Sequence, residues 1–107
     1  MTGAELIQQE RKRQVEVEGW TPEHDDKHDD QELVLAAIAY ASHNLNVDTL
    51  LRTRIAGTAS WPWDCKWWKP RPDPVRNLVK AGALIAAEID RLRVKAASDA
   101  KERGNGR

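Results

Sequence analysis

The chain has few of the residues that usually build or brace a small core. Its 107 residues include no phenylalanine, one tyrosine and one cysteine. A single cysteine excludes an intrachain disulfide and is compatible with a reducing compartment. The longest apolar run, LVLAAIAYA, is far shorter than the ~20 residues that a membrane-spanning helix needs. No signal-peptide pattern is visible at the N-terminus, so we expect a cytoplasmic protein without membrane contact.

Neither sign of charge is in excess, because 17 Lys and Arg residues balance 17 Asp and Glu residues. Bulk binding to nucleic acid needs a basic surplus, so we do not expect that function. The charges are uneven, however: residues 23–32 are strongly acidic, while residues 66–80 and the C-terminal tail are basic. The phosphate-binding GxxxxGK[ST] loop, the CxxC pair and the GxSxG elbow are also absent.

The apolar spacing predicts an all-α protein: a small bundle of three main helices, with short helices and an ordered Trp-rich loop. The first main helix is expected from Thr2, which forms a capping box with Glu5, to about Glu18, where Gly19 ends it. Its apolar face is weak, since charged residues share the middle of the helix. The sequence shows neither strand alternation nor an internal repeat.

The other two main helices have stronger patterns. Residues 31–44, preceded by the capping residue Asp29, are apolar on nearly every side, so we expect a buried central helix. A short helix capped by Asp48 follows. The last helix begins at Asp73-Pro74, and its apolar face is expected to consist of Val75, Leu78, Gly82, Ile85, Ile89, Leu92 and Ala96.

We predict one helical domain over residues 1–97 and a frayed polar tail over residues 98–107. The two apolar helices need more cover than one weakly amphipathic helix can give. A second copy of the chain would supply that cover, so we expect a homo-oligomer.

A first candidate site is the acidic segment at residues 23–32, EHDDKHDDQE. If it is helical throughout, His24, His28 and Glu32 share one face, where they could bind zinc or another divalent metal. Asp25, Asp26 and Glu32 are the candidate catalytic groups if the protein is an enzyme. The alternative is a solvated acidic turn that binds no cofactor, with histidines that pair locally.

A second candidate site is WPWDCKWWKP at residues 61–70, which holds four of the five tryptophans. Indole rings stack on bases and neighbouring cations suit phosphates, a combination typical of a nucleotide pocket. Alternatively the rings cover the open end of a core that lacks phenylalanine, or some rings do this while one or two line a pocket. The candidate ligand-binding residues are Trp20, His24, Glu32, Trp61, Trp63, Trp67, Lys69, Lys80 and Glu88.

Three of these candidates are charged residues on the predicted helices. Glu32 could hold a ligand amine or hydroxyl, or act as a general base if burial raised its pKa. It could equally be only a favourable charge at a helix N-terminus. Lys80 could meet a phosphate or an acidic neighbour, and Glu88 borders the apolar face, but a solvated face is the ordinary interpretation of both.

Several blocks of the sequence, taken together, carry a resemblance to one protein family. The stretches IQQERKRQVEVEGWTPEHDDKH, ELVLAAIAYA, WPWDCKWWKP and RNLVKAGALIAAEIDRL resemble a family of short, mostly uncharacterised proteins of tailed phages and prophages. The resemblance spares residues 45–58 and the tail, and it implies a phage-encoded protein acting in the bacterial host cytoplasm. The positions that match the family pattern are Glu10, Arg13, Trp20, Glu23, His24, Asp25, Asp26, His28, Glu32, Trp61, Trp63, Trp67, Lys80 and Glu88.

A fainter likeness is to the MazG-type all-α nucleotide pyrophosphohydrolases, which bind magnesium through carboxylates. Their E-E-x-x-E motif is missing here, so its pairing with E-x-x-D is missing too, and the nearest equivalents are Glu16 with Glu18 and Glu88 with Asp90. The likeness is therefore one of fold only.

Three functional hypotheses follow from the residues and the resemblance. The first is a phage accessory protein that binds a nucleotide-like small molecule and sequesters a host immune signal. The second is a metal-dependent nucleotide hydrolase, and the third is an inhibitor that binds a host enzyme through its Trp loop. A divalent-metal requirement distinguishes the second, and a ligand-induced change in Trp fluorescence separates the first from the third.

Overall fold

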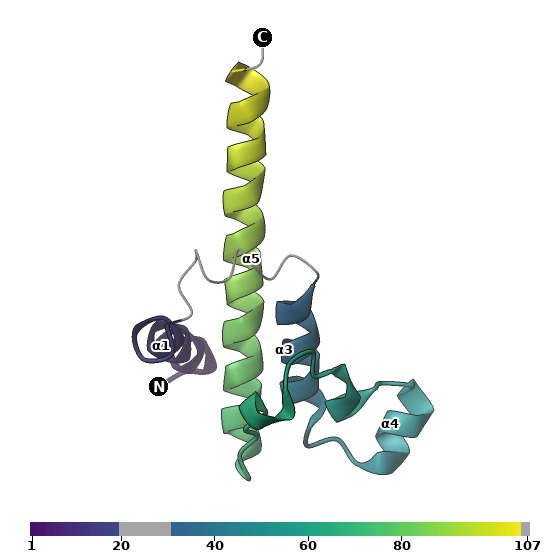
Figure 1. The fold of residues 1–107 in the computed structure, drawn as a ribbon. Coiled ribbons are helices and arrows are strands. Elements are labelled where there is room, and N and C mark those ends of the chain that lie inside the picture. Colours follow the sequence, from purple (N-terminus) through teal and green to yellow (C-terminus); the bar gives the residue numbers. More distant parts are fainter. Residues whose placement is uncertain (20–30, 106–107) are drawn as a thin grey trace.

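The computed structural model describes residues 1–19 and 31–105, and all regular structure in these two ranges is helical (Figure 1). The predicted all-α fold with three main helices is therefore confirmed. Helix α5 is the central element, with α1 packed on one side and α3 on another. In chain order the elements are α1 (Gly3–Glu16), α3 (Glu32–Ser42), α4 (Val47–Thr53), the 3₁₀ helices η1 (Gly57–Ser60) and η2 (Cys65–Trp67), and α5 (Pro74–Asn105).

Helix α1 begins with the predicted capping box. The backbone N–H of Glu5 donates to the Thr2 hydroxyl at 3.2 Å, and the backbone N–H of Thr2 donates to the Glu5 carboxylate at 3.0 Å. The helix ends at Glu16, and Gly19 then adopts a left-handed φ of 74°. The fully buried residues of α1 are polar, namely Glu10 and Gln14.

Helix α3 is buried over a wide arc that also includes Ala39 and Ser42, but it is not buried on nearly every side as expected. Its buried side contains Leu33, Ala36, Ala37 and Tyr40, which pack against α5. Three large apolar residues of α3 stay 38–39% exposed, namely Val34, Leu35 and Ile38.

The short helix α4 is capped two residues earlier than predicted. Asn46, not Asp48, is the N-cap residue, and its side chain accepts from the backbone N–H of Thr49 at 2.8 Å. Asp48 instead lies in the first turn of the helix, where its negative charge is favourable.

Helix α5 begins where the sequence predicted, since the Asp73 carboxylate accepts from the backbone N–H of Val75 at 3.0 Å. Its buried side, however, is not the predicted apolar face. Ala81, Leu84 and Ala87 face α3, and the small side chains allow the two helices to approach closely. The large apolar residues of the predicted face remain 48–55% exposed, namely Val75, Leu78, Ile85, Ile89 and Leu92.

The C-terminal part of α5 extends further than expected. The helix continues to Asn105, so residues 98–105, predicted to belong to a frayed tail, are helical. Alanines at positions 96, 97 and 100 favour the helix, and Lys95 pairs with Asp99 at 3.6 Å across one turn. Within the described residues, no helix combines the length and the apolar character needed to cross a membrane.

Asn77 joins the loop before α5 to two helices. Its amide oxygen accepts from the backbone N–H of Arg71 at 2.7 Å, and its amide nitrogen donates to the Arg71 carbonyl at 2.8 Å. The same nitrogen donates to the Asn44 side chain at 2.8 Å, just beyond the end of α3. Because Asn77 is fully buried, these bonds fix where the Trp-rich segment leaves the core.

Candidate functional site

The tryptophans of residues 61–70 divide into two groups. Trp61, Trp63 and Trp68 pack against the apolar core around Tyr40. The Tyr40 ring lies 5.5 Å from the Trp61 ring and 4.6 Å from the Trp68 ring, while Trp61 and Trp63 meet edge to face at 5.1 Å. These three indoles cover one end of the core, a role that phenylalanine often fills in other proteins.

Trp67 points away from that cluster. It is the last residue of η2, a turn started by Asp64, whose carboxylate accepts from the backbone N–H of Lys66 at 2.9 Å. Trp67 stays 55% exposed, and the ammonium groups of Lys66 and Lys69 lie 5.4 and 5.9 Å from its ring centroid. An indole that is more than half exposed, with cations nearby, is a stacking surface rather than a core residue.

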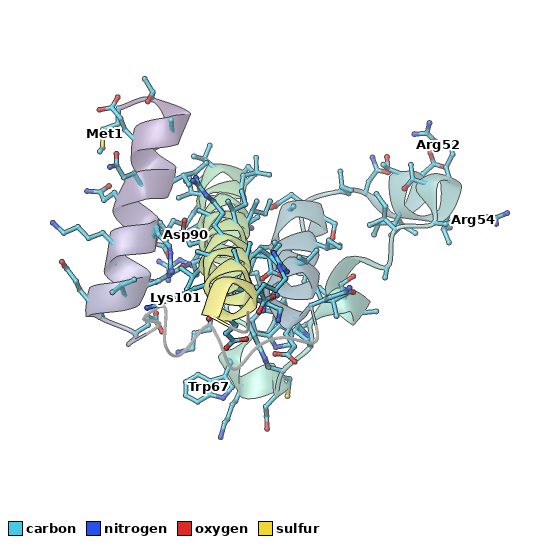
Figure 2. The ribbon with its side chains drawn as sticks, turned by 90° about the horizontal axis from the view of Figure 1, so that it is seen from above. Met1, Arg52, Arg54, Trp67, Asp90 and Lys101 are labelled. Atoms are coloured by element: carbon cyan, nitrogen blue, oxygen red, sulfur yellow. The ribbon has the colours of Figure 1, made fainter. Side chains whose placement is uncertain are left out.

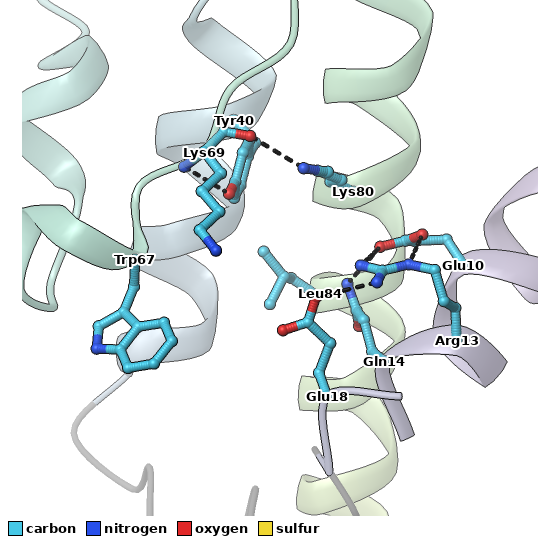
Figure 3. A pocket seen from close by; sticks show the side chains of 9 residues that line it. All are labelled: Glu10, Arg13, Gln14, Glu18, Tyr40, Trp67, Lys69, Lys80 and Leu84. Carbon is cyan, nitrogen blue, oxygen red and sulfur yellow. Dashed lines mark hydrogen bonds and ion pairs between the residues drawn. The ribbon is translucent and has the colours of Figure 1, made fainter. Parts of the chain in front are cut away.

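The Trp67 ring forms one wall of a cleft between α1, α3, α5 and the segment after η2 (Figure 3). In Figure 3 the Lys69 ammonium points into the space between Trp67 and Leu84. The cavity volume is about 40 Å³, enough for roughly three waters, so it fits a phosphate or carboxylate group. Its lining residues, called the cleft residues below, are Glu10, Arg13, Gln14, Glu18, Tyr40, Trp67, Lys69, Lys80 and Leu84.

Two lysines and the tyrosine form the upper wall of the cleft in Figure 3. The Lys80 ammonium donates to the Lys69 carbonyl at 3.0 Å and lies 5.3 Å from the Tyr40 ring centroid. The Tyr40 hydroxyl accepts from the backbone N–H of Lys69 at 3.3 Å. Burial lowers the pKa of Lys80 below its usual value, and the positive charge of Arg76 lowers it further. An anion bound here would favour the charged form of this lysine.

Glu10 organises the opposite wall. Its buried carboxylate accepts two bonds from the Arg13 guanidinium, at 2.8 and 2.9 Å, and a third from Arg76 of α5. Burial alone would raise the pKa of Glu10, but the bonds from Arg13 and Arg76, with their charges, hold it below the usual value. Arg13 also bonds Glu18 at 3.0 Å. This arginine is therefore already neutralised by two carboxylates.

Gln14 contributes an unpaired oxygen to this wall. Its amide nitrogen donates to Glu10 at 3.4 Å, which directs its amide oxygen away from the carboxylate. Oε1 of Gln14 is buried and has no hydrogen-bond partner, the single such side-chain atom in the described ranges. Buried polar atoms are nearly always paired. This oxygen is therefore an unmet hydrogen-bond acceptor within the α1 wall of the cleft.

The structure brings together three of the residues predicted from sequence, Trp67, Lys69 and Lys80, while Trp61 and Trp63 pack on the core instead. Glu32 and Glu88 do not line the cleft. Glu32 is half-buried at the start of α3, and Glu88 is buried and accepts a bond from Arg91 at 2.5 Å.

The remaining predicted site residues, Trp20, His24, Asp25, Asp26 and His28, lie outside the described residues. The metal site proposed from His24, His28 and Glu32 therefore depends on two residues whose positions are not described. Among residues 1–19 and 31–105, no group of three or more His, Cys, Asp or Glu side chains could hold a metal ion.

Sequence reasoning did not assign Glu10, Gln14 or Tyr40 to a site. A signal was present for the first two, because Ile7, Glu10 and Gln14 share one face of α1 at three- and four-residue spacing. Polar residues that continue an apolar face indicate a buried polar interface.

Comparisons of the chain with protein-family models, with curated proteins and with solved structures find no match.

Proposed function

We propose that the protein binds a nucleotide-like small molecule in this cleft, with a base on Trp67 and a phosphate against Lys69 and Lys80. The division of the tryptophans carries the proposal. Three rings of one short segment are packed on the core, while Trp67 stays exposed beside two lysines at a cleft. Exposing one large ring is unfavourable for an isolated chain, and a stacked base would cover it.

The charges around the cleft support an anionic ligand group. Arg13 already bonds Glu10 and Glu18, so Lys69 and Lys80 are the cations of the cleft that a phosphate would contact. The pKa of Lys80, lowered by burial, would rise towards its usual value beside a phosphate. The small cavity accepts the phosphate, and the rest of the ligand would lie over the exposed indole.

The resemblance to phage proteins supports a biological role for such binding. We propose that the protein sequesters a nucleotide signal of its bacterial host without converting it. This role requires affinity without turnover, whereas a nucleotide hydrolase would release product from the same ligand. Product analysis after incubation with each nucleotide tested therefore separates the two functions. If the protein is instead an inhibitor of a host enzyme, it should bind none of the nucleotides tested.

Lys66 and Lys69 provide a matched pair of variants for the binding test. Both ammonium groups approach the Trp67 ring, but only Lys69 lines the cleft. Titration calorimetry would use AMP, ADP, a cyclic dinucleotide and inorganic pyrophosphate as probes. We expect Lys69→Ala to weaken the binding of a phosphate-bearing probe by about tenfold or more. Lys66→Ala should leave the affinity within about twofold, because that residue only borders the ring.

Trp67→Leu tests the stacking part of the proposal. Stacking on one indole is worth about 1–3 kcal/mol, or roughly five- to a hundredfold in affinity. The variant should therefore weaken nucleotide binding while leaving pyrophosphate binding nearly unchanged. Thermal melts should show little loss of stability, because the ring is more than half exposed. Equal losses with Lys66→Ala and Lys69→Ala, or no binding of any probe, would contradict the proposed site.

A further inference from the structure

An exposed apolar stripe runs along α5. It consists of Val75, Leu78, Ile85, Ile89 and Leu92, each about half exposed, and is called the α5 stripe below. Helix α1 reaches this face of α5 at Gly82, where Ile7 packs, but it leaves the five stripe residues about half exposed, and α3 packs on another side of α5. Seen along the axis of α5, the two helices lie on opposite sides of it (Figure 2). Isolated monomers seldom leave such a contiguous apolar row in water.

The spacing of the stripe indicates that its partner is a helix. Together with Gly82, its positions alternate steps of three and four residues from position 75 to position 92. This average period of 3.5 is the one that keeps a seam facing a second helix along its length. The central position is already occupied from within the chain, since a Cβ at Gly82 would lie 2.6 Å from Cδ1 of Ile7. A partner helix would therefore pack beside Ile7.

A second copy of the chain could pack against the α5 stripe through its own α5 stripe. If two α5 helices run antiparallel about a two-fold axis near the middle of the stripe, Val75 faces Leu92 of the second copy and Leu78 faces its Ile89. Ile85 then faces the position of Gly82, where Ile7 supplies the apolar contact. Every contact is repeated by the symmetry, which closes the assembly at two chains. No charged residue lies within the stripe, so this register places no like charges against each other in the seam.

The antiparallel register covers α5 from Val75 to Leu92 and no further. The helix has 32 residues and extends well past α1 and α3, and no described residue after Arg91 is buried (Figure 1). In this register the two bundles lie side by side along the seam, and the residues after Leu92 of each α5 project beyond it. We propose that the protein forms a two-fold dimer with a second copy of the chain through the α5 stripe, because the stripe is complementary to itself.

Two substitutions on α5 test this surface. Leu92 lies on the stripe and is 50% exposed, while Val94 lies on another face of the helix and is 61% exposed. Sedimentation equilibrium from low micromolar to submillimolar concentration should show a reversible equilibrium between monomer and dimer. Leu92→Gln should weaken dimerisation at least tenfold, whereas Val94→Gln should leave it within about twofold.

Disulfide trapping tests the orientation. In a Cys65→Ser background, which removes the native thiol, an antiparallel seam predicts that Leu78→Cys chains cross-link to Ile89→Cys chains. Neither variant alone should then cross-link efficiently. A monomer at every concentration, or equal loss of dimer with Leu92→Gln and Val94→Gln, would overturn the interface. Efficient cross-linking of Leu78→Cys to itself would instead indicate a parallel seam and overturn the proposed geometry.

Discussion

Helix α5 packs against its two neighbours in opposite ways. Against α3 the contact is apolar and close, with Leu33 and two alanines of α3 meeting Leu84 and the alanines of α5. Against α1 the buried groups are polar, with Glu10 and Gln14 on α1 and Arg76 reaching across from α5. The first interface consists mainly of apolar side chains, which need no hydrogen-bond partner. The second leaves charges and an unpaired oxygen next to a cleft.

This difference separates the interface that stabilises the fold from the interface that lines the cleft. Apolar burial contributes free energy in proportion to area, so the α3–α5 interface should carry most of the stability. A buried ion pair contributes little net stability, because desolvation of the charges offsets their attraction. The polar residues of the α1–α5 interface are therefore better explained by the cleft that they shape than by stability.

The largest expected effect comes from breaking the apolar interface. Leu33 is 1% exposed, so Leu33→Ala should reduce the free energy of unfolding by about 2–5 kcal/mol. Urea denaturation followed by far-UV circular dichroism measures this loss. Leu51→Ala on α4 is the control, because Leu51 is 75% exposed and its removal should change stability by less than about 0.5 kcal/mol. Similar losses in both variants would contradict an apolar interface centred on Leu33.

A smaller effect is expected from the polar interface. Glu10→Gln leaves two guanidinium groups without their carboxylate, but Arg13 and Arg76 are each 37% exposed and can be hydrated. We expect a loss of about 1–3 kcal/mol at pH 7. Glu16→Gln is the control on the same helix, since Glu16 is 62% exposed and pairs only loosely with Lys12.

The loss caused by Glu10→Gln should depend on pH. The pKa of Glu10 is lower in the folded chain than in the unfolded one, so its carboxylate stabilises the fold above about pH 4.3. That contribution disappears as pH falls through the folded pKa. The stability difference between wild type and variant should therefore shrink between pH 7 and pH 2.5. A constant difference would show that the charge of Glu10 is not responsible.

The smallest effect tests how tightly α1 approaches α5. A Cβ at Gly82 would meet Cδ1 and Cγ1 of Ile7 at 2.6 and 2.8 Å. Crowding costs about 1–3 kcal/mol, and alanine returns about 1 kcal/mol of helix propensity, so Gly82→Ala should lose about 0–2 kcal/mol. Adding Ile7→Ala removes the crowding, so the double variant should be more stable than the two single losses predict. Strict additivity in thermal or urea unfolding would contradict this contact.

The local signals in the sequence were sufficient for the helices but not for their faces. The capping box of Thr2 with Glu5 and the Asp73-Pro74 start are each formed by residues that are close in the sequence. Both form as predicted. The predicted buried face of α5 was wrong because the prediction rested on large apolar residues rather than on alanines. Alanines allow a closer helix approach, and α3 packs on them.

The candidate site was predictable only in part, for a related reason. Trp67, Lys69 and Lys80 combine chemistry typical of nucleotide binding, and the structure places them in one cleft. The opposite wall depends on Arg76 bonding Glu10, two residues 66 positions apart. No local spacing encodes such a pair, and only the crossing of α1 over α5 brings it together.

The same separation of 66 positions has a consequence for synthesis. A ribosome adds about 5–20 residues per second, so α1 waits roughly 3–13 seconds before Arg76 is made. During that interval the face that α1 will later bury is in water. Glutamate and glutamine tolerate this delay, whereas an apolar face would be an early target for aggregation or chaperones. The polar side of α1 thus lets the first helix of the chain remain soluble until its partner, the last helix, has been translated.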